Sequence, residues 1–217
     1  MLRSPVLGVV ATVVSMLTLG GASADTLSLS GGTAGTLPNN FDPTGLATMS
    51  LDGIGVGTPI TIFSGTSNTG GLSVSPTAGV TFTFMGKEAS FTNQLLFGNT
   101  VLFNNNVALG TSSATFTVSA GLVPFSFQAP GNLNAKNGGA IGRDLRIAFA
   151  KVSDTVFYAF FEDGTDKDFD DMVIKITDPP AVVATPLPGA LPLFAGGFAA
   201  LGLLGRRRKK KAAALTA

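Results

Sequence analysis

Hydrophobic and polar residues alternate in three stretches in the middle of the chain: residues 80–84 (VTFTF), 114–118 (ATFTV) and 123–127 (VPFSF). Successive side chains of a β-strand point to opposite faces of a sheet. A period of two therefore places the phenylalanines on one face and the threonines on the other. This pattern predicts strands whose aromatic faces pack together in a core.

Short apolar runs predict five further strands, at residues 60–63, 100–103, 145–152, 155–161 and 172–176. Gly and Asn clusters between them are typical of turns. Pro124 has no backbone N–H to donate, so we predict that residues 123–127 form an edge strand or a bulge. Residues 25–58 are rich in Gly and Pro, and they predict a first strand followed by loops.

Many short strands separated by polar turns favour an all-β fold. We expect an antiparallel β-sandwich, jelly-roll-like, in which the alternating phenylalanines form the layer between the sheets. No segment between the two ends of the chain has the long 3.6-residue period of an amphipathic helix.

The first 24 residues have the layout of a cleavable signal peptide. A basic residue is followed by an apolar run and by small residues that include Ala22 and Ala24. We expect cleavage after Ala24, and a retained N-terminal anchor is the alternative. The exported domain then spans residues 25–180.

The other end of the chain predicts a membrane anchor. After a linker at residues 181–188, residues 189–205 carry no charge, and the uncharged stretch from Leu187 to Gly205 would be about 28 Å long as a helix. Residues 206–217 form a basic tail, and basic residues beside a span stay in the cytoplasm. The basic cluster consists of Arg206, Arg207, Arg208, Lys209, Lys210 and Lys211. A buried helix with a solvated basic tail is the alternative.

A short motif precedes this span: Thr185, Pro186, Leu187, Pro188 and Gly189. Together, the motif, the apolar stretch and the basic end resemble the PEP-CTERM family of sorting tails, in its Val-Pro-Leu-Pro-Ala variant. The chain departs from that variant at Thr185 and Gly189. The resemblance covers about the last thirty-three residues. It implies recognition by an exosortase, a Gram-negative host with exopolysaccharide, and a membrane-anchored intermediate before delivery to the cell surface or the extracellular matrix.

The net charge of +1 hides an acidic domain. Seven of the fourteen basic residues lie in the two ends, whereas all thirteen acidic residues lie between Asp25 and Asp178, so the exported domain carries −6. Because nucleic acid phosphates repel such a domain, we expect no nucleic-acid partner.

The chain contains no Cys and no His. This composition excludes Ser-His-Asp and Cys-His nucleophile systems, and zinc or copper sites built on imidazole or thiolate. Carboxylates, amides and hydroxyls remain, and these groups favour hard cations and carbohydrate contacts.

Six of the thirteen acidic residues lie within positions 162–171, between two predicted strands. They are Glu162, Asp163, Asp166, Asp168, Asp170 and Asp171. Carboxylates this close repel one another by about 1 kcal/mol per pair at 4 Å, even in water. A bound Ca²⁺, which takes six to eight oxygen ligands, would remove that repulsion. The alternative is a solvated acidic turn in which Asp170 or Asp171 caps backbone donors.

The acidic loop does not follow the EF-hand spacing, because the invariant Gly of that loop would fall on Asp171. Residues 160–174 instead resemble the E-D-x-x-D-x-D-F-(N/D)-D signature of a domain in bacterial surface proteins, for which calcium binding has been suggested. The resemblance carries that suggestion to the six acidic residues.

Three functions are consistent with these features. The first is a non-enzymatic surface or matrix protein, stabilised by calcium and associated with exopolysaccharide or biofilm. The second is a carbohydrate-binding or adhesive module. The third is a glycoside hydrolase that uses Glu162 and Asp170, but only Tyr158 is available to stack a sugar outside the core.

Overall fold

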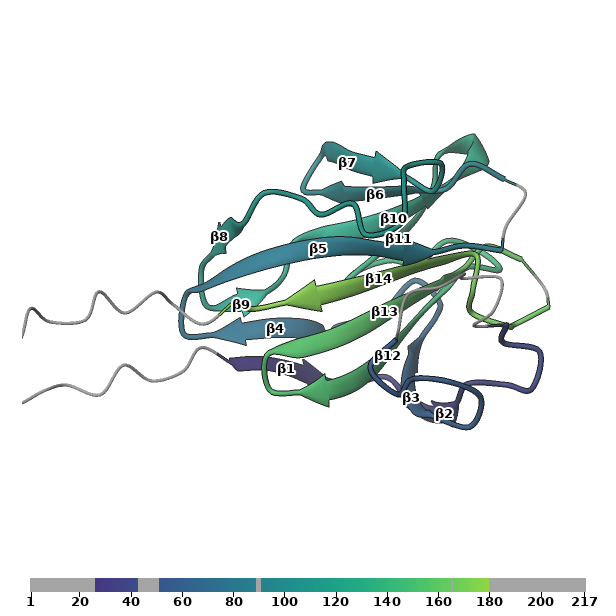
Figure 1. The fold of residues 1–217 in the computed structure, drawn as a ribbon, viewed down its shortest axis with the longest axis horizontal. Coiled ribbons are helices and arrows are strands. Elements are labelled where there is room, and N and C mark those ends of the chain that lie inside the picture. The colour runs from purple at the N-terminus through teal and green to yellow at the C-terminus, as the bar shows by residue number, and fades with distance from the viewer. Residues whose placement is uncertain (1–25, 43–50, 89–90, 165, 180–217) are drawn as a thin grey trace, which may run out of the picture.

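The computed structural model describes residues 26–42, 51–88, 91–164 and 166–179 (Figure 1). These residues form antiparallel β-sheets and a single turn of 3₁₀-helix at Pro130–Asn132. The predicted all-β, antiparallel, sandwich-like fold is confirmed. In this part of the chain, no helix is long and apolar enough to span a bilayer.

The largest sheet has seven strands in the order β2-β3-β12-β13-β14-β5-β8. Their bounds are β2 Thr33–Thr36, β3 Pro59–Phe63, β12 Arg146–Ser153, β13 Val156–Glu162, β14 Met172–Thr177, β5 Ala78–Gly86 and β8 Phe116–Val118. β12, β13 and β14 follow one another as two hairpins, with Phe149 opposite Ala159 and Ala159 opposite Ile174. These hairpins lie at the centre of the sheet.

Two smaller sheets complete the fold. One has the order β1-β4-β9, with β1 Thr26–Ser30, β4 Gly71–Ser75 and β9 Gly121–Leu122. The other has the order β11-β10-β6-β7, with β11 Leu133–Lys136, β10 Phe125–Ala129, β6 Gln94–Phe97 and β7 Thr100–Asn104.

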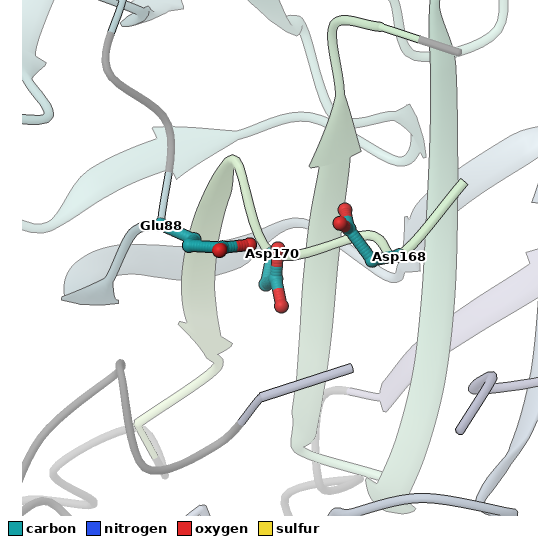
Figure 2. A group of neighbouring side chains, drawn as sticks. All are labelled: Glu88, Asp168 and Asp170. Carbon is teal, nitrogen blue, oxygen red and sulfur yellow. The ribbon is translucent and has the colours of Figure 1, made fainter. Parts of the chain in front are cut away.

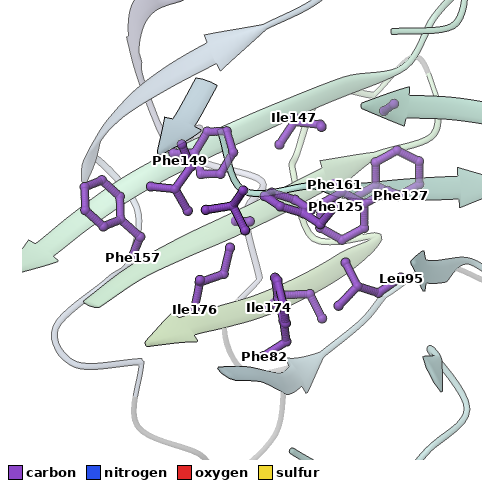
Figure 3. Close-up of a cluster of buried hydrophobic side chains, with 14 of the residues drawn as sticks. Phe82, Leu95, Phe125, Phe127, Ile147, Phe149, Phe157, Phe161, Ile174 and Ile176 are labelled. Carbon is purple, nitrogen blue, oxygen red and sulfur yellow. The ribbon is translucent and has the colours of Figure 1, made fainter. Parts of the chain in front are cut away.

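The main core lies between one face of the large sheet and the two smaller sheets (Figure 3). Phe82 and Phe84 of β5 are buried in it, as are Phe125 and Phe127 of β10. Phe127 stacks on Phe161 of β13, with ring centroids 4.9 Å apart. The alternation of phenylalanine along the sequence therefore forms the layer between the sheets, as predicted.

The opposite face of the large sheet is also covered. Leu37, Phe41 and Leu51, from the segment that the sequence predicts as loops, pack on Tyr158 and Phe160 of β13. β13 is consequently buried on both faces, and its run VFYAFF is typical of such a strand. Tyr158 is fully buried, so the expectation that it lies outside the core is wrong.

The prediction that residues 123–127 form an edge strand or a bulge is also wrong. β10 begins at Phe125 and is an inner strand, paired with β6 on one side and β11 on the other. Pro124 lies just before the first paired residue, where its missing N–H costs no ladder bond.

The expected signal peptide, with Ala22 and Ala24, lies outside the described residues. So do the sorting motif (Thr185, Pro186, Leu187, Pro188, Gly189), the predicted span and the basic cluster at residues 206–211.

Candidate metal centre

The acidic residues singled out in the sequence surround the hairpin connection between β13 and β14. Glu162 ends β13, and Asp171 immediately precedes β14. The chain reverses between them, as expected from the strand predictions on either side.

Most of this acidic group is buried. Glu162 and Asp170 are fully inaccessible, and Asp168 and Asp171 are at most 9% exposed. Asp163 is half-buried and Asp166 is exposed. Four adjacent buried carboxylates are unusual, since Asp and Glu are almost never fully buried unless they are paired.

Phe169 anchors the loop between the two strands. Its ring is buried in the second core, against the outer face of the large sheet. Phe169 and Lys167 both have left-handed backbone conformations, with φ of 67° and 61°. They flank Asp168, so the chain turns sharply on both sides of that carboxylate.

Glu162 holds the two arms of the loop together. Its Oε1 accepts a hydrogen bond from the Gly164 N–H at 2.9 Å, and its Oε2 accepts one from the Phe169 N–H at 3.3 Å. The Asp163 N–H donates to Asp171 Oδ2 at 2.6 Å. These bonds fix both carboxylates relative to the loop backbone.

Two distant segments attach to Asp170. The Asp42 N–H donates to Asp170 Oδ2 at 2.9 Å, and the Glu88 N–H donates to the Asp170 carbonyl at 2.7 Å. Figure 2 shows the Glu88 side chain extending toward Asp170 from the segment after β5. The site therefore includes residues from three parts of the chain.

The second oxygen of Asp170 has no donor. Asp170 Oδ1 is buried and accepts no hydrogen bond. Burying a polar oxygen without a partner is costly, and native proteins satisfy such atoms with donors, water or a metal ion.

The carboxylate oxygens form two close sets. In one set, oxygens of Glu88, Asp168 and Asp170 lie within 4.8 Å of one another, and in the other, so do oxygens of Glu162, Asp166 and Asp168. Asp163 and Asp171 belong to neither set. In the described part of the chain, no Lys or Arg forms an ion pair with any of these carboxylates.

The electrostatics reflect this crowding. Burial raises the pKa of Asp170 to about 8, and the negative charges of Asp168 and Glu88 act in the same direction. Burial likewise raises the pKa of Asp171 to about 8, assisted by the charges of Asp163, Glu162 and Asp168. The pKa of Glu162 is also raised, mainly by burial. Without a cation, the cluster resists ionisation.

Comparisons with known proteins assign no family. No family model matches the sequence, and no curated protein matches it. The solved structure of the Ralstonia solanacearum high-affinity mannose-binding lectin aligns with 54% of this chain and 95% of its own, at 21% identity and a TM-score of 0.30. At that TM-score, the likeness assigns neither a family nor a ligand to this chain.

The two sets of carboxylates could hold a metal ion. Their ligand atoms are hard oxygens, which suit Ca²⁺, Mg²⁺ or Mn²⁺ rather than a soft metal. Two oxygens bound to one Ca²⁺ at 2.3–2.6 Å can lie at most about 5 Å apart, so the spacing within each set fits a shared ion.

The sequence did not indicate that Glu88 or Asn93 belongs to the site. Glu88 stands alone in the sequence, close to the end of β5, and only the pairing of β5 with β14 brings it to the acidic loop. Asn93 is fully buried and donates from Nδ2 to Asp163 Oδ2 at 2.5 Å. No local motif marks either residue.

Proposed function

We propose that this protein is an exported, non-enzymatic surface or matrix protein whose acidic hairpin loop binds Ca²⁺ and is stabilised by it. One observation carries the calcium part of this proposal. The fully buried Asp170 has an oxygen without a donor, and that carboxylate faces Glu88 and Asp168. A cation supplies the missing partner.

Ca²⁺ fits this donor set better than Mg²⁺. The carboxylates come from a turn and from a separate strand end, and they offer many oxygens in an irregular arrangement. Ca²⁺ accepts six to eight oxygens in flexible geometry, whereas Mg²⁺ requires a near-ideal octahedron and retains several waters. Extracellular calcium modules bind in the range of about 10⁻⁴ to 10⁻³ M, which suits an exported protein.

The placement of the acids supports a structural role rather than catalysis. Glu162 and Asp170, the pair considered for glycoside hydrolysis, are both fully buried. Glu162 is occupied by two backbone N–H donors, and Asp170 by one. A hydrolase needs two carboxyls that reach a sugar from opposite sides, and these two carboxyls hold the loop instead.

The sorting part of the proposal rests on the sequence. A leader at residues 1–24 and the sorting tail from Thr185 onward imply export, membrane anchoring and processing by an exosortase. The cell surface or the matrix of a Gram-negative bacterium is then the destination. Exopolysaccharide is the partner that the resemblance implies, and the charge of −6 on the exported domain argues against nucleic acid.

Thermal unfolding with and without Ca²⁺ tests the calcium site. At about 100-fold excess over the dissociation constant, a ligand adds about 2.7 kcal/mol, which for a domain of this size raises the melting temperature by about 5–10 °C. We expect that rise in 10 mM CaCl₂ relative to EGTA, and we expect Asp168→Asn to abolish it.

Asp144→Asn is the matched control. Asp144 is exposed, lies outside the cluster, and has a left-handed backbone conformation that Asn tolerates. This variant should respond to Ca²⁺ like the unmodified protein. Identical melting curves in CaCl₂ and EGTA for the unmodified protein would exclude the calcium function.

A further inference from the structure

We propose that the acidic loop binds two Ca²⁺ ions, which share the carboxylate of Asp168, and that Glu88 is a ligand of one of them. This inference rests on the proposed calcium function and specifies its stoichiometry and ligands. The two sets of carboxylates are the starting point, because Asp168 is the single member that they have in common.

The distances between carboxylate oxygens define two separate ion positions, one for each set. Within each set, the ligand oxygens lie within 4.8 Å of one another, which matches two Ca–O bonds of about 2.4 Å each. The five carboxylates do not form one such set. A single ion at either position therefore leaves two carboxylates without a cation, whereas two ions contact all five.

Asp168 is placed to serve both ions. Its carboxylate has two oxygens, each with free lone pairs, and it is 6% exposed between the two sets. The left-handed residues on each side of it direct the chain so that Asp166 and Asp170 fall in different sets. A carboxylate in this position can bridge two cations.

The first position, formed by Glu88, Asp168 and Asp170, contains a buried oxygen that lacks a partner. Asp170 is fully buried, its Oδ2 already accepts from the Asp42 N–H, and its Oδ1 has no donor. Figure 2 shows Glu88 and Asp168 on either side of Asp170. The Glu88 N–H bond to the Asp170 carbonyl holds the two segments together, so Glu88 approaches the position with its backbone already fixed.

The second position is formed by Glu162, Asp166 and Asp168, and Glu162 is its most rigidly placed ligand. Its two oxygens each accept one backbone N–H, which orients the carboxylate and leaves further lone pairs for a cation. Asp166 is exposed and closes the set from the solvent side. Glu88 is exposed in the same way at the first position, so water can complete both coordination shells.

Charge also favours two ions. The five carboxylates carry −5 when ionised, and one Ca²⁺ leaves −3, whereas two leave −1. No described Lys or Arg forms an ion pair with them to offset the remainder. Because the site keeps a net negative charge after the first ion binds, it still attracts a second cation.

Counting bound ions tests the proposal directly. The full-length protein is stripped with EGTA, returned to CaCl₂, and analysed by native mass spectrometry and by calorimetric titration. We expect two Ca²⁺ per chain in the unmodified protein, one in Glu88→Gln, one in Asp166→Asn and none in Asp168→Asn. Glu88 and Asp166 are exposed, so neither substitution disturbs the core.

The outcomes separate the two proposals. One ion in the unmodified protein overturns the shared site and leaves the calcium function standing, and no ion overturns both. Two ions that persist in Glu88→Gln overturn the assignment of Glu88. Asp144→Asn, which lies outside both sets, should retain two ions.

Discussion

The carboxyls of Asp170 and Asp171 give the metal-free protein a specific pH dependence. Burial raises the pKa of each to about 8, whereas Asp in an unfolded chain titrates near pH ~4. A group with a raised pKa binds its proton more tightly in the folded state. The stability from this proton binding is therefore fully present below pH ~4, and it is lost as the pH rises toward about 8.

We therefore expect the melting temperature of the EGTA-treated protein to fall between about pH 5 and pH 8, by about 10 °C or more. The chain has no His or Cys to titrate in that range, and Glu162, whose pKa is also raised by burial, acts in the same direction as the two aspartates. Asp170→Asn should reduce the slope, and Asp144→Asn should leave it unchanged. A melting temperature independent of pH in the unmodified protein would contradict the assignment.

At the residue scale, the sequence predicted part of the site. The six acids of the loop are visible because they lie within ten positions and between strong strand signals. The roles of Glu88 and of the Asp42 N–H could not be predicted from the sequence. Their proximity to Asp170 depends on how β5 and the segment before β3 pack. Burial of the acids could not be predicted either, since it results from the second core around Phe169.

At the element scale, the strands that the sequence predicted are those with apolar alternation or a dense apolar run. β5, β12, β13 and β14 belong to this group, and they form the centre of the large sheet. The strands that it missed are short or rich in Gly, Ser and Asn, such as β2 (TAGT) and β11 (LNAK). They carry too few apolar residues for a pattern, and their neighbours supply the hydrogen bonds that make them strands.

Asn137 joins elements that share no ladder. Its Oδ1 accepts from the Leu72 N–H at 2.8 Å, and its Nδ2 donates to the carbonyls of Leu72 and Val123 at 2.7 and 2.8 Å. One side chain thus ties the end of β11 to β4 and to the segment before β10. A side chain at Gly71 would collide with this amide, which explains the glycine there.

Asn137→Ala should destabilise the protein by about 1–3 kcal/mol, because the Leu72 N–H loses its acceptor and the carbonyls of Leu72 and Val123 each lose one of two donors. Chemical denaturation measures the change. Asn137→Asp should be intermediate or worse, since a carboxylate keeps the acceptor and loses both donated bonds. Asn99→Ala, at an exposed turn, is the control and should cost less than about 0.5 kcal/mol. Equal effects at the two positions would refute the bridging role.

At the scale of the whole molecule, the two ends of the described domain meet at one place. The Leu27 N–H donates to the Asp154 carbonyl, and the Asp178 N–H donates to the Thr155 carbonyl, so both ends bind the turn between β12 and β13. The acidic loop lies at the other end of β13 and β14 (Figure 1). A C-terminal anchor would then hold the domain by this end. The acidic loop would point away from the bilayer, at the far end of β14, whose length is about 20 Å.

Processing of the chain in its native host is the last prediction. We expect the exported protein to begin at Asp25, one residue before β1, and to lose its basic tail when the sorting enzyme is present. Intact mass and terminal sequencing measure both events, and a strain without the enzyme should keep the chain through Ala217 in the membrane. Pro188→Ala, within the motif, should block removal of the tail, whereas Pro179→Ala, outside it, should not. A full-length, soluble protein inside wild-type cells would overturn the export proposal and leave the calcium site to be judged by its own tests.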